Sequence, residues 1–426
     1  MKLTLITIAV GASLGNALFA AAQSSNYTAH EWGTFTSFQG SDGTLMPWRP
    51  LETSKLPGFV YDWTKPGYQR VSTSELTQNL PNQGGKGDIN ALQRMETPVI
   101  YFYPDSPMPV DVTVKFPKGV ITEWYPQASQ IGPATGTGKA PEAALVSNNF
   151  VSSESLIHWS DLLTLPRNQH MMAPPTLPTD TTGTNYFAAR ETDSASLMSI
   201  GNTPSETEKF LFYRGVGNFG TPLRVVMKSD DGVNLANNGN EPISHLFVLS
   251  IKGGQGRYLD MSHLDPGSVS NVVLSSATEI PLSELSQKLG ADMATALAQT
   301  GLYPKEAAAM VKTWQDSWFT EPGVRVLYLL PRAWTDDTLP ISFLPQPQSL
   351  VRTMVGRTEI LAPGLEQELS TELQGASQGS AVATSQAQSE LRSLGRFASP
   401  AFNRASQLVN FSPQEANRLK ELLLKP

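Results

Sequence analysis

The chain has 426 residues, a net charge of −7, no cysteine and only 16% charged residues. This balance argues against a nucleic-acid partner, because phosphate binding needs a basic surface, and the lack of cysteine excludes disulfides, thiolate metal sites and cysteine nucleophiles. The 32 prolines and 33 glycines are spread along the chain, which favours many short strands and turns over long helices.

The first 22 residues are predicted to be a secretory signal peptide. Lys2 gives a positive start, residues 3–19 are apolar or small, and Ala20–Ala22 provide a small-residue cleavage site. We therefore expect a secreted or periplasmic protein. After cleavage it would have no transmembrane segment, because no later apolar run is long enough to span a bilayer.

Residues 23–361 are expected to form a β-rich main body. Alternating apolar residues around central turn signals predict three hairpins. The second turns at Asp231-Gly232 and the third at Gly253-Gly254. The three hairpins are predicted over residues 108–126, 222–237 and 245–261.

The pattern becomes helical at about residues 282–319, which predicts a helical insert in this body. Two strands are predicted after it, over 323–331 and 349–361. Residues 362–426 are expected to be a helical, partly low-complexity C-terminal tail, in which Ser412 and Glu415 form a capping box. The fold class predicted from these elements is α+β, with a predominantly antiparallel, sandwich-like body.

A glycine pattern, Gly215-x-Gly217-x-x-Gly220, has the spacing of a dinucleotide-binding fingerprint. Such a fingerprint works only where the third glycine opens a helix that faces the pyrophosphate. Residues 221–228 are instead strand-like, so we predict no nucleotide. The glycines are expected to form a loop between strands with positive φ angles.

His30 and Glu31 are adjacent in AHEWGTFTS, a short strand-like run in which they would point to opposite faces. One interpretation makes His30, with Glu31, Glu191 or Asp193, a general base or a metal ligand. The other makes it a hydrogen-bonded histidine at a strand edge, and we favour this second interpretation.

Charge is concentrated at residues 187–193 in an otherwise charge-poor chain. Arg190, with Glu191 and Asp193 beside it and Arg214 further along, could bind a carboxylate or phosphate group of a ligand. Alternatively, Arg190 and Arg214 form internal ion pairs that brace strands, as partly buried arginines usually do.

Residues 229–241 offer hard oxygen ligands suited to Ca²⁺, among them Asp230, Asp231 and Asn234. Their spacing does not match an EF-hand loop, and two successive turns would explain the same residues. We predict no cofactor, with Ca²⁺ or Zn²⁺ as the alternative.

The tryptophans allow two interpretations. Trp314 and Trp318 fall on the apolar stripe of a predicted helix and are expected in the core. The others flank turns and could either be buried or stack against sugar rings. They include Trp32, Trp48, Trp63, Trp124 and Trp159.

Several segments together resemble a family of exported bacterial proteins that carry an HEWGTFT signature. The resemblance implies a bacterial, extracytoplasmic setting and one integrated unit from about residue 28 to 361, and it implies no activity. The segments are AHEWGTFTS (29–37), METPVIYFY (95–103), FPKGVITEWYP (116–126), YFAARETD (186–193), EKFLFYRGVGNF (208–219), GLYPKEAAAMVKTWQDSWF (301–319) and MVGRTEIL (354–361).

The function predicted from the sequence is therefore a broad one. We expect an extracytoplasmic binding protein with a glycan, peptide or protein ligand. One alternative is a secreted hydrolase, metal-assisted or not, that uses His30 with nearby carboxylates. Another is a purely structural or assembly role.

Overall fold

A computed structural model describes residues 25–51, 56–62, 90–132, 155–166, 175–181, 184–201 and 204–424. The predicted signal peptide and Trp63 lie outside these residues. None of the described helices is both long and apolar enough to cross a membrane.

The body is built on one large sheet of ten strands. Its edge-to-edge order is β16 (Ile280–Pro281), β14 (Gln255–Leu264), β13 (Ile243–Lys252), β17 (Gly323–Leu329), β19 (Pro347–Ile360), β1 (Ser25–Gln39), β3 (Gln93–Pro104), β10 (Leu211–Gly217), β5 (Gly119–Tyr125) and β2 (Tyr61–Asp62). Every pairing in it is antiparallel except that of β1 with β19.

Two smaller antiparallel sheets pack against one face of this sheet. The first contains β18 (Ile341–Leu344), β4 (Met108–Lys115), β7 (Leu156–Leu165), β8 (Ser196–Ser199), β9 (Thr207–Glu208) and β6 (Gln130–Gly132). The second contains β11 (Leu223–Met227), β12 (Gly232–Asn237) and β15 (Val269–Val273), followed by the short 3-10 helix η2 (Leu274–Ser276). One apolar core joins all three sheets, from Ile100 of β3 to Trp159 of β7 and Leu235 of β12.

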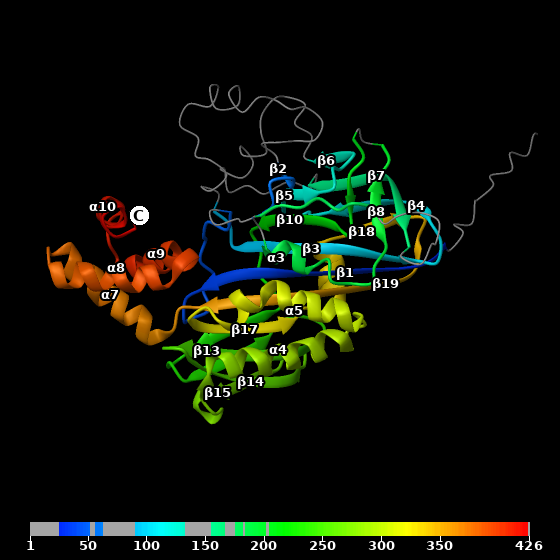
Figure 1. Cartoon of the computed structure of the whole chain (residues 1–426). Coiled ribbons are helices and arrows are strands. Elements are labelled where there is room, and N and C mark those ends of the chain that lie inside the picture. The colour runs from blue at the N-terminus through cyan, green and yellow to red at the C-terminus, as the bar shows by residue number, and fades with distance from the viewer. Residues whose placement is uncertain are drawn as a thin grey trace, which may run out of the picture.

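Helices cover the other face of the large sheet (Figure 1). These are α3 (Thr184–Ala188), α4 (Leu282–Gln299) and α5 (Pro304–Phe319), while α6 (Arg332–Thr338) is a short helix between β17 and β18. A second apolar core fills this layer and joins Trp32 and Phe212 of the sheet to Met310 and Trp318 of α5. Layers of helix, sheet and sheet confirm the predicted α+β class and its sandwich-like, largely antiparallel body.

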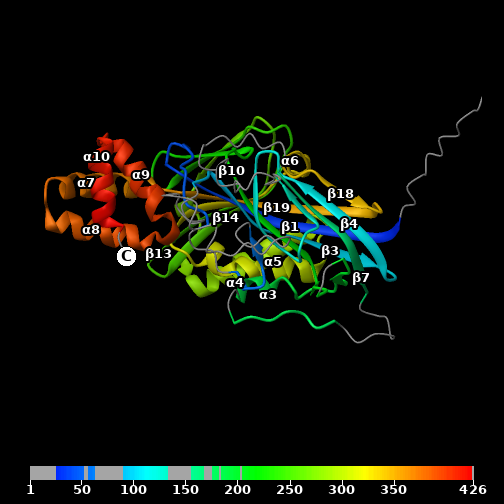
Figure 2. The ribbon, with the colours of Figure 1, turned by 90° about the horizontal axis from the view of Figure 1, so that it is seen from above.

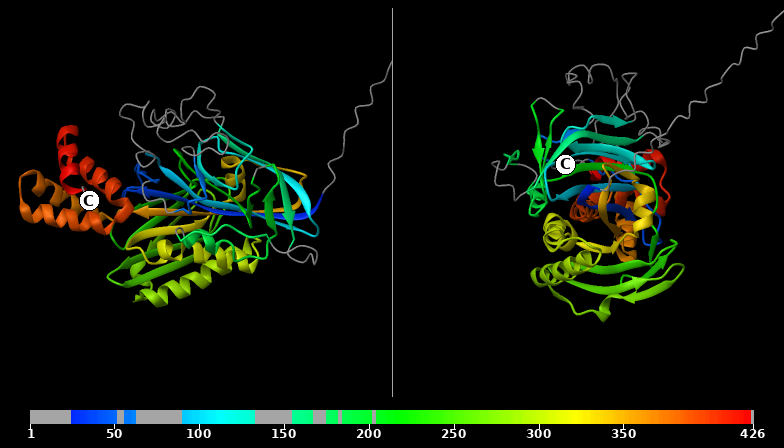
Figure 3. Two further views of the ribbon diagram at one scale, coloured as in Figure 1. Left: turned by 45° about the horizontal axis from the view of Figure 1, so that its top comes forward. Right: turned by 90° about the vertical axis from the view of Figure 1, so that its right-hand side faces the viewer.

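The chain ends in four helices that lie together at one end of the body (Figures 2 and 3). They are α7 (Pro363–Ser377), α8 (Ala381–Ser393), α9 (Ala398–Val409) and α10 (Pro413–Leu423), with the 3-10 helix η3 (Gly395–Phe397) between α8 and α9. We call residues 362–424 the tail. Its core includes Leu373, Leu391 and Phe402, and it packs on Phe38 and Trp48 of the body.

Most of the predicted elements are present. The hairpins over 222–237 and 245–261 form as β11–β12 and β13–β14, and Gly253 and Gly254 have the positive φ angles of a tight turn. The helical insert is α4 and α5. In the predicted capping box, the Ser412 side chain accepts a hydrogen bond from the backbone N–H of Glu415.

The predicted hairpin over 108–126 is wrong. β4 and β5 do not pair, because β4 joins the six-stranded sheet and β5 joins the large sheet. Each strand therefore has its own set of neighbours, and residues 116–118 connect two layers. The alternation over 110–114 correctly indicated a strand, but a local pattern does not identify its partner.

Candidate functional site

A row of charged side chains crosses the helix-covered face of the large sheet. Alternation within each strand directs these residues away from the core that joins the three sheets and towards α5. They are Arg325 on β17, Arg357 and Glu359 on β19, Arg94 and Glu96 on β3, Arg214 on β10, and Glu123 on β5, and all of them are buried.

Strand register brings these charges into line. Arg325 is the cross-strand partner of Glu359, and Arg214 is that of Glu123. Between them, Thr36 of β1 pairs with Arg357 on one side and with Arg94 on the other. Pairing fixed by the sheet thus gathers residues that lie more than 250 positions apart in the sequence.

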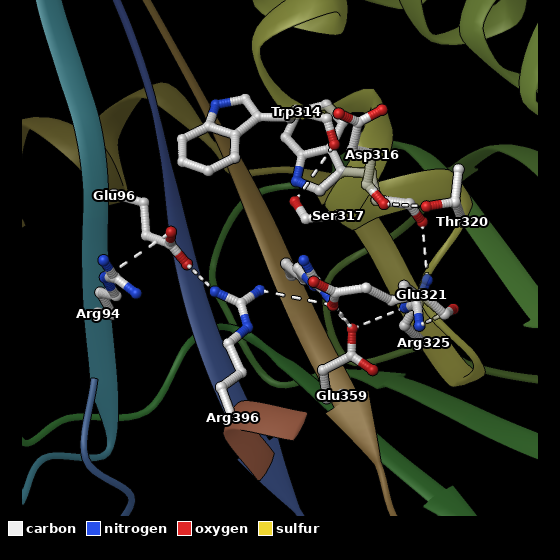
Figure 4. A network of polar contacts seen from close by, with 12 residues as sticks. Arg94, Glu96, Trp314, Asp316, Ser317, Thr320, Glu321, Arg325, Glu359 and Arg396 are labelled. Atoms are coloured by element: carbon white, nitrogen blue, oxygen red, sulfur yellow. Dashed lines mark hydrogen bonds and ion pairs between the residues drawn. The ribbon is translucent and has the colours of Figure 1, made fainter. Parts of the chain in front are cut away.

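Two further charges cover this row, from the end of α5 and from the tail (Figure 4). Glu321, just after α5, lies 2.6 Å from Arg357. Arg396 of η3 reaches into the body, where its Nη1 lies 3.3 Å from Glu96 and its Nη2 lies 3.8 Å from Glu321. On the opposite side of Glu96, the Nε of Arg94 is 3.7 Å from the carboxylate.

A cavity of about 210 Å³ lies beside these groups, and we call it the arginine cavity. Three guanidinium groups and two carboxylates line it, and one of the three, that of Arg214, belongs to the cross-strand partner of Glu123. The lining residues are Leu56, Arg94, Glu96, Thr97, Asn185, Tyr186, Arg214, Thr313, Trp314, Ser317, Glu321 and Arg396.

Several buried nitrogen donors on this lining have no hydrogen-bond acceptor within the described part of the chain. They are Nε of Arg94, Nε and Nη2 of Arg396, and the indole Nε1 of Trp314. Buried donors without partners are uncommon because each one loses its bond to water on folding. Since every one of these groups is a donor, a ligand that completes the site must supply acceptors.

The pKa values of the lining residues follow from the same arrangement. Burial lowers the pKa of Arg94 to about 10, and the neighbouring charge of Arg214 contributes to this decrease. Burial also lowers the pKa of Arg396. Desolvation is the largest cause of both decreases, and the negative charge of Glu96 partly offsets it.

In the pKa of Glu96, the effect of burial is outweighed by that of the neighbouring arginines. Burial alone would raise the pKa of this carboxyl group, but the charges of Arg94, Arg396 and Arg214 more than offset that effect, and the pKa falls to about 2. Glu96 is therefore ionised over the whole physiological range and acts as a fixed counter-charge between two arginines.

His30 lies on the helix-covered face near the start of β1, 2% exposed, and meets a carboxylate that the sequence analysis did not name. Its Nδ1 is 2.6 Å from Oε2 of Glu306 on α5. Glu306 also accepts hydrogen bonds from the Tyr103 hydroxyl, at 2.8 Å, and from the Tyr303 backbone N–H, at 2.7 Å. The arrangement anchors the first turn of α5 on β1.

Glu31 points to the opposite face, as the strand alternation predicted. It is fully buried, 2.5 Å from Nε of Arg352, and it accepts a hydrogen bond from the Tyr213 hydroxyl. His30 and Glu31 are therefore not brought together in one site.

The charged segment 187–193 is engaged in ion pairs. Arg190 makes two hydrogen bonds to the buried Glu208, through Nε at 2.9 Å and Nη2 at 2.6 Å. Glu191 and Asp193 pair with Lys312 and Lys305 of α5, at 2.5 and 2.7 Å. Of the proposed ligand-binding residues, Arg214 lies on the arginine cavity and the other three do not.

The oxygen-rich segment 229–241 forms turns around β12. Asp230 accepts a hydrogen bond from the Gly364 N–H of the tail, and Asp231 accepts from the N–H and hydroxyl of Ser275. The Asn234 amide donates to Asn271. Within the described residues, no three or more His, Asp or Glu side chains form a group that could hold a metal ion.

As predicted, no helix follows the glycine pattern at 215–220, because β10 leads directly to β11. The predicted positive φ angles are wrong, since none of the three glycines has one. The glycines instead allow close packing. A Cβ on Gly215 would lie 2.5 Å from the Val120 carbonyl oxygen of β5.

The tryptophans for which both burial and sugar stacking were left open are in the interior, except that Trp63 lies outside the described residues. Burial rules out the sugar-stacking interpretation for each of those the structure describes, and confirms the core positions expected for the α5 pair. The exposed fractions are 0% for Trp32, 1% for Trp48, 1% for Trp124, 0% for Trp159, 8% for Trp314 and 0% for Trp318.

No family model matches the chain, and no curated protein matches it. Some solved structures match the chain at low similarity. The μ-homology domain of Fcho1 from Danio rerio with a bound Eps15 peptide has a TM-score of 0.29 and 6% identity, over 80% of this chain and 99% of that chain. The yeast δ-COP-I μ-homology domain has a TM-score of 0.26 and 7% identity, over 79% of this chain and 95% of that chain. TM-scores of this size do not establish a shared fold.

Proposed function

We propose that the protein is an extracytoplasmic binding protein and that the arginine cavity holds a carboxylate group of its ligand. The observation that carries this proposal is the set of buried donors on Arg94, Arg396 and Trp314 that have no acceptor within the described residues. The extracytoplasmic location rests on the apolar N-terminal segment and on the resemblance to exported proteins.

Shape favours a carboxylate over a phosphate. Guanidinium groups bind planar carboxylates through two parallel hydrogen bonds. At about 210 Å³, the cavity is smaller than the roughly 300–1,000 Å³ of drug-sized ligand sites. The ligand is therefore a small organic acid, or an acidic group of a peptide or glycan.

Isothermal titration calorimetry of the full chain with sodium acetate, succinate and phosphate, at constant ionic strength and pH 7, tests the proposal. We expect saturable binding of at least one carboxylate. Arg94→Gln should weaken that binding about tenfold or more, since it removes one charged fork from the site. Arg94→Lys keeps the positive charge but loses the planar pair of guanidinium donors, so it should weaken binding by a smaller factor.

The matched control is Arg257→Gln, which removes a partly exposed arginine paired with Glu279 at 3.2 Å. It should bind the carboxylate as the unmodified protein does. The proposal is overturned if none of the three anions binds saturably, if Arg94→Gln binds with unchanged affinity, or if phosphate binds more tightly than both carboxylates.

A further inference from the structure

A second cavity lies at the junction between the tail and the body, and it has a volume of about 400 Å³. We call it the tail groove. On one side of it β13 and β19 of the large sheet end and β17 begins, and helices α7 and α8 with η3 form the other side. Glu321 and Arg396 line both this groove and the arginine cavity, so the two spaces adjoin.

The floor of the tail groove is apolar. On the body side it is formed by Ile251, Val324 and Ile360, which are at most 7% exposed. On the tail side it is formed by Leu365, Leu394 and Phe397. Side chains of the tail and the body leave this space unfilled, and an apolar group that entered it would be removed from water.

Five carboxylates and two cations lie around this floor. Three of the carboxylates are already compensated by neighbours in the protein. Glu321 and Glu359 pair with Arg357, and Asp230 accepts the Gly364 N–H. The set on the lining is Asp230, Glu321, Glu359, Glu368 and Glu390, with Lys252 and Arg396.

The other two carboxylates, Glu368 of α7 and Glu390 of α8, make no ion pair within the described residues. Glu372 lies beside them, and one of its oxygens is buried without a hydrogen-bond partner. Partial burial raises the pKa of Glu372, and the negative charges of Glu390 and Glu368 raise it further. These carboxylates therefore repel one another on the tail side of the groove.

We propose that the tail groove binds a basic amphipathic peptide segment, whose apolar side chains occupy the floor and whose Lys or Arg side chains face Glu368 and Glu390. At about 400 Å³, the groove is within the roughly 300–1,000 Å³ of typical ligand pockets. An anionic membrane surface is a poor occupant, because its headgroups would meet the same carboxylates. The inference rests on Glu368, Glu390 and the apolar floor, none of which lines the arginine cavity.

Fluorescence anisotropy of the full chain with two labelled, capped peptides tests this. One peptide has the sequence Lys-Leu-Leu-Lys and the other Glu-Leu-Leu-Glu. We expect the basic peptide to bind and the acidic peptide to bind at least about tenfold more weakly, with the difference decreasing as salt increases. Glu368→Gln with Glu390→Gln should weaken the basic peptide about tenfold. Because this double substitution removes like-charge repulsion, it should leave the fold intact.

The matched control is Asp105→Asn with Glu191→Gln. It removes two exposed carboxylates from outside the tail groove and should leave binding unchanged. Arg94→Gln should also bind the basic peptide normally, which separates this inference from the carboxylate site. The proposal would be overturned if the two peptides bound with equal affinity. It would also be overturned if the double variant and its control lost affinity for the basic peptide by the same factor.

Discussion

Glu96 shows how a single buried side chain depends on its neighbours. It is 3% exposed and lies between Arg94 and Arg396. An isolated carboxylate at this depth would be strongly disfavoured, so its ionisation depends on the surrounding arginines, and those arginines depend on it in turn.

This dependence gives a pH prediction. The pKa of Glu96 falls from an ordinary 4.5 to about 2 in the folded protein. A carboxyl group whose pKa is lower in the folded than in the unfolded protein stabilises the folded state at pH values above the unfolded pKa. This stabilisation is lost as the pH falls through the folded pKa. The free energy of unfolding, from urea titrations, should therefore decrease between about pH 4.5 and about pH 2.

Glu96→Gln should remove this part of the acid dependence. At pH 7 it should also lower the free energy of unfolding by about 3–5 kcal/mol, because it leaves buried arginines without their counter-charge. Glu191→Gln breaks an exposed pair with Lys312 and should change stability by less than about 1 kcal/mol. An unchanged acid profile in Glu96→Gln would contradict the assignment.

At the scale of one element, α5 links the two polar groups of the helix-covered face. Its first turn carries Glu306, which is fixed by His30, Tyr103 and Tyr303, and its end leads to Glu321 beside Arg357. Between these ends, Met310 and Trp318 pack on the sheet. The position of Glu321, and so the shape of the arginine cavity, depends on how α5 is held.

Glu306→Gln should therefore loosen the helix at its start. The amide has one acceptor oxygen where the carboxylate has two, so one of the three donors would lose its partner. We expect the free energy of unfolding to fall by about 2–4 kcal/mol. Glu284→Gln is the matched control, since Glu284 occupies the first turn of α4 in an exposed pair with Lys288, and it should lower stability by less than about 1 kcal/mol.

Part of this arrangement could be read from the sequence. The apolar stripe on residues 304–319 and the alternation in 245–261 identified α5 and the β13–β14 hairpin, because these signals are local. Arg94 and Glu96 also carried a local signal, since charges two residues apart in an otherwise apolar strand share one face.

The rest could not be predicted, because it depends on pairing over long sequence distances. The sequence gives no sign that Glu306 would meet His30, or that Arg396 would reach Glu96 across 300 residues. For the same reason, β4 and β5 resembled a hairpin although they belong to different sheets.

At the scale of the whole molecule, aromatic packing and ion pairs hold the tail to the body. Phe397 packs on Phe38 and Trp48, with ring centroids 5.3 and 5.2 Å apart. Arg404 pairs with Asp42 at 2.9 Å. Because Arg396 of the tail lines the arginine cavity, the cavity is complete only when the tail packs on the body.

Phe397→Ala should release the tail. The substitution empties a buried aromatic position, which costs about 3–5 kcal/mol in a core. We expect faster amide hydrogen exchange in residues 363–423, little change in β1 and β3, and weaker carboxylate binding. Leu422→Ala, at a residue that is 50% exposed on α10, should leave exchange and binding unaltered. Uniformly faster exchange across the body would show instead that the tail and body unfold as one unit.

The parallel pairing of β1 with β19 also determines when the body can form. Glu31 and its buried partner Arg352 are 321 positions apart, so a ribosome must synthesise most of the chain before the central strand finds its neighbour. Such a topology folds slowly, because the ends of a very long loop must first meet. A growing chain therefore cannot close its central sheet until β19 has been synthesised.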